Sequence, residues 1–141
     1  MRKSAYALLL VLGIASLSVL ANNIDTAKAL EMKYAAVAKN INPNFKGFSP
    51  DAGRAFYIRE MTIRGKQVSC ASCHTDNPAN VGKHKDTKKK IDALAPSANP
   101  KGFTSVDKVE KHFAKHCQDI IGLDCTVQEK GDFIAYLLTV E

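Results

Sequence analysis

Apolar residues recur at three- and four-residue spacing in the N-terminal half of the chain, which is the period of a helix that buries one face. The first such stretch spans 24–39 and stops before the turn-prone segment 40–44. Its stripe consists of Ala27, Leu30, Tyr34 and Val37. A second helix is expected from Pro50 to about Ile63, because Ser49 can cap it and proline suits the first helical position. Its apolar face holds Gly53, Phe56, Tyr57 and Ile58.

Two further helices are predicted toward the C-terminus. One begins near Thr104, which forms a weak capping pair with Asp107, and ends near Gly122. Its stripe consists of Val106, Val109, Phe113, Cys117 and Ile120. The last helix opens at a capping box formed by Thr126 and Glu129. Its inward face consists of Phe133, Ile134, Leu137 and Leu138, with Tyr136 beside them.

The middle of the chain, from Gly65 to Gly102, lacks an apolar period and is rich in Lys, Gly, Pro, Asn and Asp. Loops are therefore expected there, with a turn of helix after Cys70. Loops of this length usually serve a function. A chain of 141 residues forms one small domain rather than a multidomain enzyme. The predicted fold class is all-α.

The N-terminus carries the features of a secretory signal. Arg2 and Lys3 precede an apolar run over 5–20, which ends at the small-residue site Val19-Leu20-Ala21. This pattern indicates a cleaved signal peptide over residues 1–21 and a periplasmic protein. The alternative is an uncleaved membrane anchor, although the run is shorter than the roughly 20 residues that span a bilayer. Cleavage would remove two cations from a chain with a formal charge of +6.

The chemistry is concentrated in Cys70-Ala71-Ser72-Cys73-His74, the Cys-x-x-Cys-His motif to which a c-type haem is attached. The two thiols add to the two vinyl groups of one porphyrin edge, and the histidine then reaches the iron from the proximal side. A thioredoxin-like dithiol would need a βαβ pattern, and a zinc site would need a second Cys/His pair. Neither context is present. We predict one covalent haem c on Cys70 and Cys73, with His74 as the proximal ligand.

Segments on both sides of this motif resemble class I cytochromes c. The segments Asp51-Ala52-Gly53-Arg54-Ala55-Phe56-Tyr57 and Gly131-Asp132-Phe133-Ile134-Ala135-Tyr136-Leu137 are similar to the crossing terminal helices of that family. In the family, a glycine on the first helix lets an aromatic residue of the last helix approach closely. The resemblance implies that Gly53 faces Phe133 and Tyr136.

A closer resemblance is to the sphaeroides haem protein group, small exported monohaem cytochromes with an unusual distal side. It covers nearly the whole mature chain, including weaker matches at Leu30 and Tyr34. It depends on Ala95-Pro96-Ser97-Ala98, Phe103-Thr104, Val109-Glu110-Lys111, Ile121-Gly122, Asp124-Cys125 and Glu129-Lys130-Gly131-Asp132. The resemblance implies a class I cytochrome c domain over 47–141, preceded by an extension helix within 22–46.

The sixth iron ligand is expected to be His116. Met1, Met32 and Met61 all precede the haem motif, which excludes a His/Met haem of the ordinary chain order. His116 lies within roughly 40° of the centre of its helix's apolar stripe, whereas His112 lies roughly 80° away. His84 lies among lysines, which is typical of a solvated loop. The alternative is that His116 only packs or caps the helix, which would leave the iron five-coordinate or bound to water.

The resemblance changes what this ligand implies. In the sphaeroides haem protein group, an asparagine before the first distal cysteine binds ferric iron and leaves on reduction, which opens a site for oxygen or nitric oxide. Here His116 occupies that position, before Cys117. Imidazole is a stronger ligand than an amide, so we expect it to hold both oxidation states in a low-spin haem.

The remaining cysteines, Cys117 and Cys125, are expected to form a disulfide. An exported compartment is oxidising, and the haem already accounts for the other two thiols. A structural bridge that fixes the end of the helix carrying His116 is favoured over a redox-active one.

A basic segment follows the haem motif and contains Lys83, Lys85, Lys88, Lys89 and Lys90. It would attract an acidic partner to the exposed haem edge, unless it is an ordinary solvated loop. The resemblance implies a redox partner, either a dihaem cytochrome c or a membrane b-type cytochrome. Nucleic acid is not expected, because the patch has no interleaved aromatic residues and the protein is exported.

The predicted function is periplasmic electron transfer without enzymatic turnover, since no hydrolytic or phosphate-binding set of residues is present. The alternative is reversible binding of oxygen or nitric oxide, as a sensor or with reductive turnover.

Overall fold

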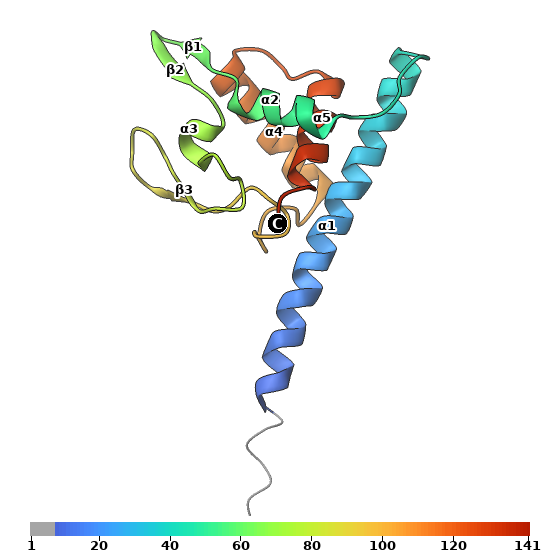
Figure 1. The fold of residues 1–141 in the computed structure, drawn as a ribbon, viewed down its shortest axis with the longest axis vertical. Helices are drawn as coiled ribbons and strands as arrows, with labels where there is room; N and C mark the ends of the chain where they lie inside the picture. Colours follow the sequence, from blue (N-terminus) through green and yellow to red (C-terminus); the bar gives the residue numbers. More distant parts are fainter. Residues whose placement is uncertain (1–7) are drawn as a thin grey trace, which may run out of the picture.

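The computed structural model describes residues 8–141, with side chains from residue 22 onward. Its long helices are α1 (Leu8–Ile41), α2 (Pro50–Ile58), α4 (Val106–Ile121) and α5 (Val127–Leu137). Between α2 and α4 lie the single-turn helix α3 (Ala71–His74) and two antiparallel hairpins, β1 (Met61–Ile63) with β2 (Lys66–Val68) and β3 (Gly82–Lys83) with β4 (Lys90–Ile91). Figure 1 shows α1 as a long rod against one side of a small helical domain. The all-α prediction is confirmed.

The expected signal peptide, residues 1–21, lies outside the residues whose side chains are described. Its cleavage and the domain boundary after residue 46 therefore stay predictions. Over the part of the chain that the structure covers, no helix combines the length and the apolar character needed to cross a membrane.

The centre of the fold is the crossing of α2 and α5. A Cβ atom at Gly53 would overlap the carbonyl oxygen of Asp132 and lie 2.8 Å from the Cβ of Tyr136. The expected approach of Tyr136 to Gly53 is therefore confirmed, while the ring of Phe133 packs one turn further along, against Phe56 and Tyr57. Buried Asp132 adds a polar tie, because its Oδ1 accepts a hydrogen bond of 2.8 Å from the backbone N–H of Ser49.

The ends of the helices follow the capping signals, with one exception. Ser49 accepts a hydrogen bond from the N–H of Ala52, and Thr126 and Glu129 form the predicted capping box. Helix α4 is capped by Ser105 rather than by Thr104, because Ser105 is the last extended residue and its hydroxyl accepts from the N–H of Lys108. Gly122 ends α4 in the left-handed region at φ +79°, as its position predicted.

Helix α1 covers α4 and α5, and one part of its predicted stripe is wrong. Val37 is 41% exposed, and Ala38 is buried in its place. The buried stripe of α1 consists of Asn23, Ala27, Leu30, Tyr34 and Ala38. A four-residue step after Tyr34 keeps the stripe over its partner helices, whereas a three-residue step turns it outward.

The segment after α2 also differs from the prediction. The second helix was expected to reach Ile63, but it ends at Ile58 and the chain enters the β1–β2 hairpin. Arg64 and Gly65, at φ +51° and +75°, form the positive-φ turn that suits a two-residue hairpin. The β-branched Thr62 and Ile63 ahead of a glycine are a signal for this turn. The turn of helix expected after Cys70 is confirmed as α3.

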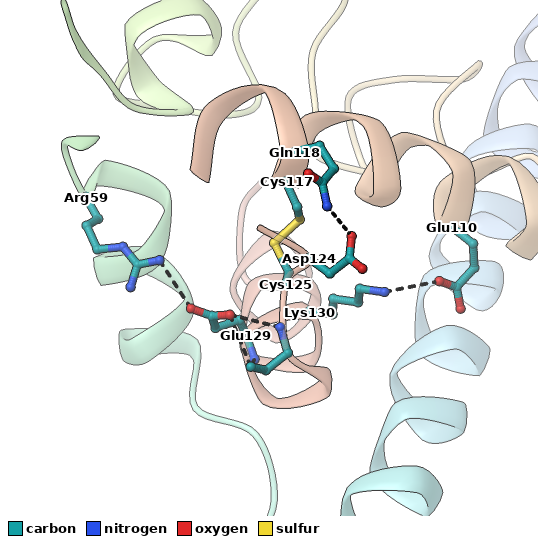
Figure 2. The surroundings of a disulfide bond; sticks show 9 residues. Arg59, Glu110, Cys117, Gln118, Asp124, Cys125, Glu129 and Lys130 are labelled. Carbon is teal, nitrogen blue, oxygen red and sulfur yellow. Dashed lines mark hydrogen bonds and ion pairs between the residues drawn. A yellow bond between two sulfur atoms is a disulfide. The ribbon is translucent and has the colours of Figure 1, made fainter. Parts of the chain in front are cut away.

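The predicted disulfide between Cys117 and Cys125 is present and joins the end of α4 to the start of α5 (Figure 2). Its Cα atoms are 5.6 Å apart, and the residues are separated by 8 positions. Closing such a short loop in the unfolded chain contributes about 2.5 kcal/mol of stability in the chain-entropy account. The partly exposed pair of Arg59 and Glu129, 3.2 Å apart, contributes less than about 1 kcal/mol.

We expect Gly53→Ala to destabilise the protein because the added methyl group would force α2 away from the backbone of α5. Overpacking of this kind costs about 1–3 kcal/mol or more. Denaturant unfolding of the haem-loaded protein would measure the loss. Ala55→Ser, on the exposed side of α2, is the control and should change the free energy of unfolding little. An unchanged stability of Gly53→Ala would show that the crossing is not as close as described.

Candidate functional site

Helix α3 places the two thiols and the imidazole of the haem motif within one helical turn. Cys70 stands at the N-cap position without a side-chain capping hydrogen bond, and His74 is the last residue of the helix. Neither Cys70 nor Cys73 forms a disulfide. Two serines fix the start of the turn, because Ser72 Oγ accepts from the N–H of Ser69 at 2.9 Å and Ser69 Oγ accepts from the N–H of Ser72 at 3.2 Å. These two hydrogen bonds hold the backbone at the start of the haem motif.

The residue after the motif has an unusual backbone. Thr75 adopts φ +68° and ψ +171°, a region essentially restricted to glycine, which costs about 1–3 kcal/mol. Two hydrogen bonds hold it there. The hydroxyl of Tyr57 donates to the Thr75 carbonyl at 2.5 Å, and Thr75 Oγ1 donates to the Asn77 carbonyl at 2.8 Å. The chain therefore leaves His74 in a strained and closely held turn.

The β3–β4 hairpin packs directly on the motif. A Cβ atom at Gly82 would overlap the carbonyl oxygen of Cys73 and lie 3.0 Å from the Cα of His74. Glycine is required at this position by the close approach of the two backbones. The contact sets the hairpin beside the end of α3 that carries His74.

The proximal candidate His74 is kept neutral. Burial, followed by the charge of nearby His116, lowers the pKa of His74 to about 4. Its Nδ1 is buried and forms no hydrogen bond within the described part of the chain. Burial also raises the pKa of the Cys70 thiol to about 11. A neutral imidazole is the form that binds a metal ion.

The distal candidate His116 lies on α4, near enough to His74 for its charge to lower the pKa of His74. The side chain of His116 is exposed to solvent. Its partial desolvation by the surrounding protein still lowers its pKa, and His112 and Lys115 add to this effect while Asp119 opposes it. The rings of His112 and His116 are 5.7 Å apart, centre to centre. His116 forms no hydrogen bond with any of residues 22–141.

His84 does not belong to the site formed by His74 and His116. It lies in the exposed turn between β3 and β4, where its Nδ1 accepts hydrogen bonds from the N–H groups of Asp86 and Thr87. This agrees with the expectation of a solvated loop for the segment. His84 shapes the turn and is not a candidate ligand.

These residues fit a covalent haem. Two free thiols lie one turn apart, and a neutral, half-buried imidazole follows them, whose buried Nδ1 has no partner among the described residues. A second imidazole from α4 lies nearby. Over the described residues there is no cluster of three or more His, Cys, Asp or Glu side chains that could hold a metal ion by itself. Cys70 and Cys73 would hold the group covalently, and His74 would supply an imidazole to its iron.

The lysines of the basic segment are all exposed on the β3–β4 hairpin and its turn. Two contacts attach this turn to the neighbouring hairpin. Lys85 Nζ donates to the carbonyl of Gln67 at 2.7 Å, and Lys66 pairs with Asp86 at 3.4 Å. The positive surface is therefore held close to the haem motif through Gly82.

Sequence reasoning did not find two residues of this site. The sequence predicts Tyr57 only as part of the apolar face of its helix, and Thr75 only as part of the long central loop. The hydroxyl of Tyr57 was a signal in principle, since a buried tyrosine usually needs a hydrogen-bond partner. The positive φ of Thr75 had no sequence signal, because β-branched residues avoid that region.

Two relatives of this chain have solved structures. Cytochrome c'' of Methylophilus methylotrophus is 50% identical over 118 residues, which cover 83% of this chain and 82% of that protein. Its solution structure, described as giving insights into haem-ligand detachment, has a TM-score of 0.75 at 50% identity and covers 82% of this chain and 94% of its own.

The second relative is the cytochrome c-type protein SHP of Cereibacter sphaeroides, 40% identical over 89 residues, or 62% of this chain and 67% of that protein. The structure of oxidised SHP, described as an oxygen-binding cytochrome c, has a TM-score of 0.68 at 33% identity and covers 79% of this chain and 94% of its own.

A family described as a domain of unknown function, DUF1924, matches residues 43–137. The resemblance to the sphaeroides haem protein group is thus confirmed, and so are the fold class and the cofactor. The chain belongs to the family of cytochrome c'' and the sphaeroides haem protein, and it is a monohaem c-type cytochrome with a class I fold that binds one haem c covalently.

Proposed function

We propose that this protein is a periplasmic electron carrier whose haem iron is bound by His74 and His116. The observation that carries the proposal is the pairing of two neutral imidazoles, one from α3 and one from α4, close enough for the charge of one to lower the pKa of the other. The haem supplies a one-electron iron couple. Two imidazole ligands favour a low-spin iron of lower potential than a His/Met pair.

The residues around the site support a carrier by limiting how far the ligands can move. His74 ends a helix whose start is fixed by two serines and whose exit is held by Tyr57. The disulfide at Cys117 anchors the last turn of α4, next to His116. A ligand set that moves little between oxidation states suits electron transfer.

We expect the wild-type protein to be low-spin in the ferric state and His116→Ala to be high-spin. The reason is that the substitution removes the imidazole proposed as the sixth ligand. Optical spectra and low-temperature electron paramagnetic resonance of both proteins would measure the change.

His112→Ala is the matched control, since it removes the neighbouring imidazole four residues earlier on the same helix, and it should stay low-spin. A high-spin wild-type ferric protein would exclude His116 as a ligand. It would also support the second candidate function, binding of a small gas.

A second candidate function is reversible binding of a small gas such as oxygen or nitric oxide. It is favoured by the absence of any hydrogen bond from His116 to residues 22–141, so that the bond to iron would be the main restraint on its ring. The descriptions of the two relatives, one on haem-ligand detachment and one on oxygen binding, point the same way. Release of His116 on reduction would open the sixth position.

Carbon monoxide binding to the reduced protein distinguishes the two functions. If His116 stays bound, we expect carbon monoxide to bind slowly in wild type and rapidly in His116→Ala, because the imidazole must leave first. Stopped-flow mixing under anaerobic conditions would give both rates. Rapid and complete binding by wild type would contradict the carrier with a fixed distal ligand and support the gas-binding protein.

We further propose that the exposed lysines of the β3–β4 hairpin receive an acidic redox partner, such as a dihaem cytochrome c or a membrane b-type cytochrome. The hairpin lies against the haem motif, so a partner docked there would be near the cofactor. Complementary charge speeds encounter more than it strengthens binding.

Small redox reagents test this surface without a known partner. Reduction of the ferric protein by anionic iron–EDTA should slow as ionic strength rises, and it should be slower in Lys88→Glu/Lys90→Glu, because the positive field near the haem is lost. Lys28→Glu/Lys39→Glu, with the same charge change on exposed positions of α1, is the control. Equal reduction rates for the two double variants would contradict the proposal that electrons enter the haem next to the β3–β4 hairpin.

A further inference from the structure

We infer that Tyr57 is a positioning residue for the proximal histidine, acting through its hydrogen bond to the backbone of Thr75. This inference depends on the proposed role of His74 but not on that of His116. It concerns a residue of α2 that lies outside the haem motif.

The position of the Tyr57 hydroxyl is fixed by the helix crossing. Tyr57 is fully buried, with 0% of its surface exposed. Its ring centre lies 6.2 Å from that of Phe133 and 5.7 Å from that of Tyr136, both on α5. It is one helical turn beyond Gly53, where α2 and α5 are in closest contact. The ring therefore has little room to move, and its hydroxyl is a fixed point.

The Tyr57 hydroxyl contacts the chain at Thr75, where the backbone is strained. The hydroxyl donates to the carbonyl of Thr75 at 2.5 Å, directly after the histidine. Thr75 has the φ and ψ of a glycine, so without outside restraints it would relax to a common conformation. Burial holds the pKa of Tyr57 above its ordinary value, so the hydroxyl stays a donor at any physiological pH.

The imidazole of His74 depends on this backbone more than most iron-binding histidines would. Such histidines are usually oriented by a hydrogen bond from the second ring nitrogen. His74 Nδ1 is buried and has no such partner among the described residues. The ring plane is then set by the peptide on either side of His74. On one side Cys73 packs against Gly82, and on the other Thr75 is held by Tyr57.

Tyr57→Phe tests the inference, because it removes one oxygen atom and keeps the buried ring. The readout is the proton nuclear magnetic resonance spectrum of the ferric cyanide complex. In that complex cyanide occupies the sixth position, so the pattern of haem methyl shifts reports the orientation of the proximal imidazole alone. We expect the methyl shifts to change by several parts per million.

Tyr136→Phe is the matched control. Its ring packs against Tyr57, and its hydroxyl forms no hydrogen bond with any of residues 22–141, so the methyl pattern should stay as in wild type. Thr75→Gly provides a rescue, because glycine adopts the same φ and ψ without strain. The double variant Tyr57→Phe/Thr75→Gly should return toward the wild-type pattern, and it would also restore folding if Tyr57→Phe alone folds poorly.

A wild-type pattern of haem methyl shifts in Tyr57→Phe would overturn the inference. Equal changes in Tyr57→Phe and in Tyr57→Phe/Thr75→Gly would do so too, because they would reflect general loosening of the core. The wild-type cyanide complex tests the proposed ligand separately. Strongly shifted ring protons of His74 appear there only if His74 binds the iron.

Discussion

The contact between Gly53 on α2 and the backbone of Asp132 on α5 is the constraint on which the rest of this structure depends. It brings together two helices that are far apart in the sequence, so closely that a Cβ atom at Gly53 would overlap the backbone of Asp132. One turn later on α2, Tyr57 reaches the chain at the end of the haem motif. On α5, the first turn follows directly after the disulfide to α4, the helix that carries His116. The positions of the proximal and distal sides of the haem site therefore both depend on the crossing of α2 and α5.

The two sides of the site are held in different ways. On the proximal side, serine hydroxyls restrain the peptides of Ser69 and Ser72, a glycine contact that of Cys73, and a tyrosine hydroxyl that of Thr75. On the distal side, a covalent bridge restrains the backbone beside His116, while its ring projects without a polar partner among the described residues. A rigid proximal anchor with a less restrained distal ring is compatible with a carrier and with a ligand-binding protein. A single iron–nitrogen bond separates these two functions.

Local signals in the sequence predicted much of this molecule. The capping box at Thr126, the Ser49-Pro50 start and the apolar stripe of α4 each specify a helix by short-range chemistry, and the haem motif needs only five consecutive residues. The failures lie where the outcome depends on distant parts of the chain. Either Val37 or Ala38 could extend the buried stripe of α1, and the direction in which α1 crosses its neighbours places Ala38 inside and Val37 outside. Thr75 takes a conformation against its own preference, because Tyr57 and Asn77 stabilise it from outside.

Helix α1 covers an apolar surface of the domain. Tyr34 meets the edge of Phe113, and Lys130 lies over both rings, while Glu110 pairs with Lys33 at 3.1 Å and with Lys130 at 3.6 Å. Helix α1 thus acts as a lid on an apolar seam between α4 and α5. A shortened chain that begins after α1 would keep its haem motif but uncover Phe113 and the seam. Exposed apolar strips of this kind promote self-association of small domains, and α1 shields this one from solvent.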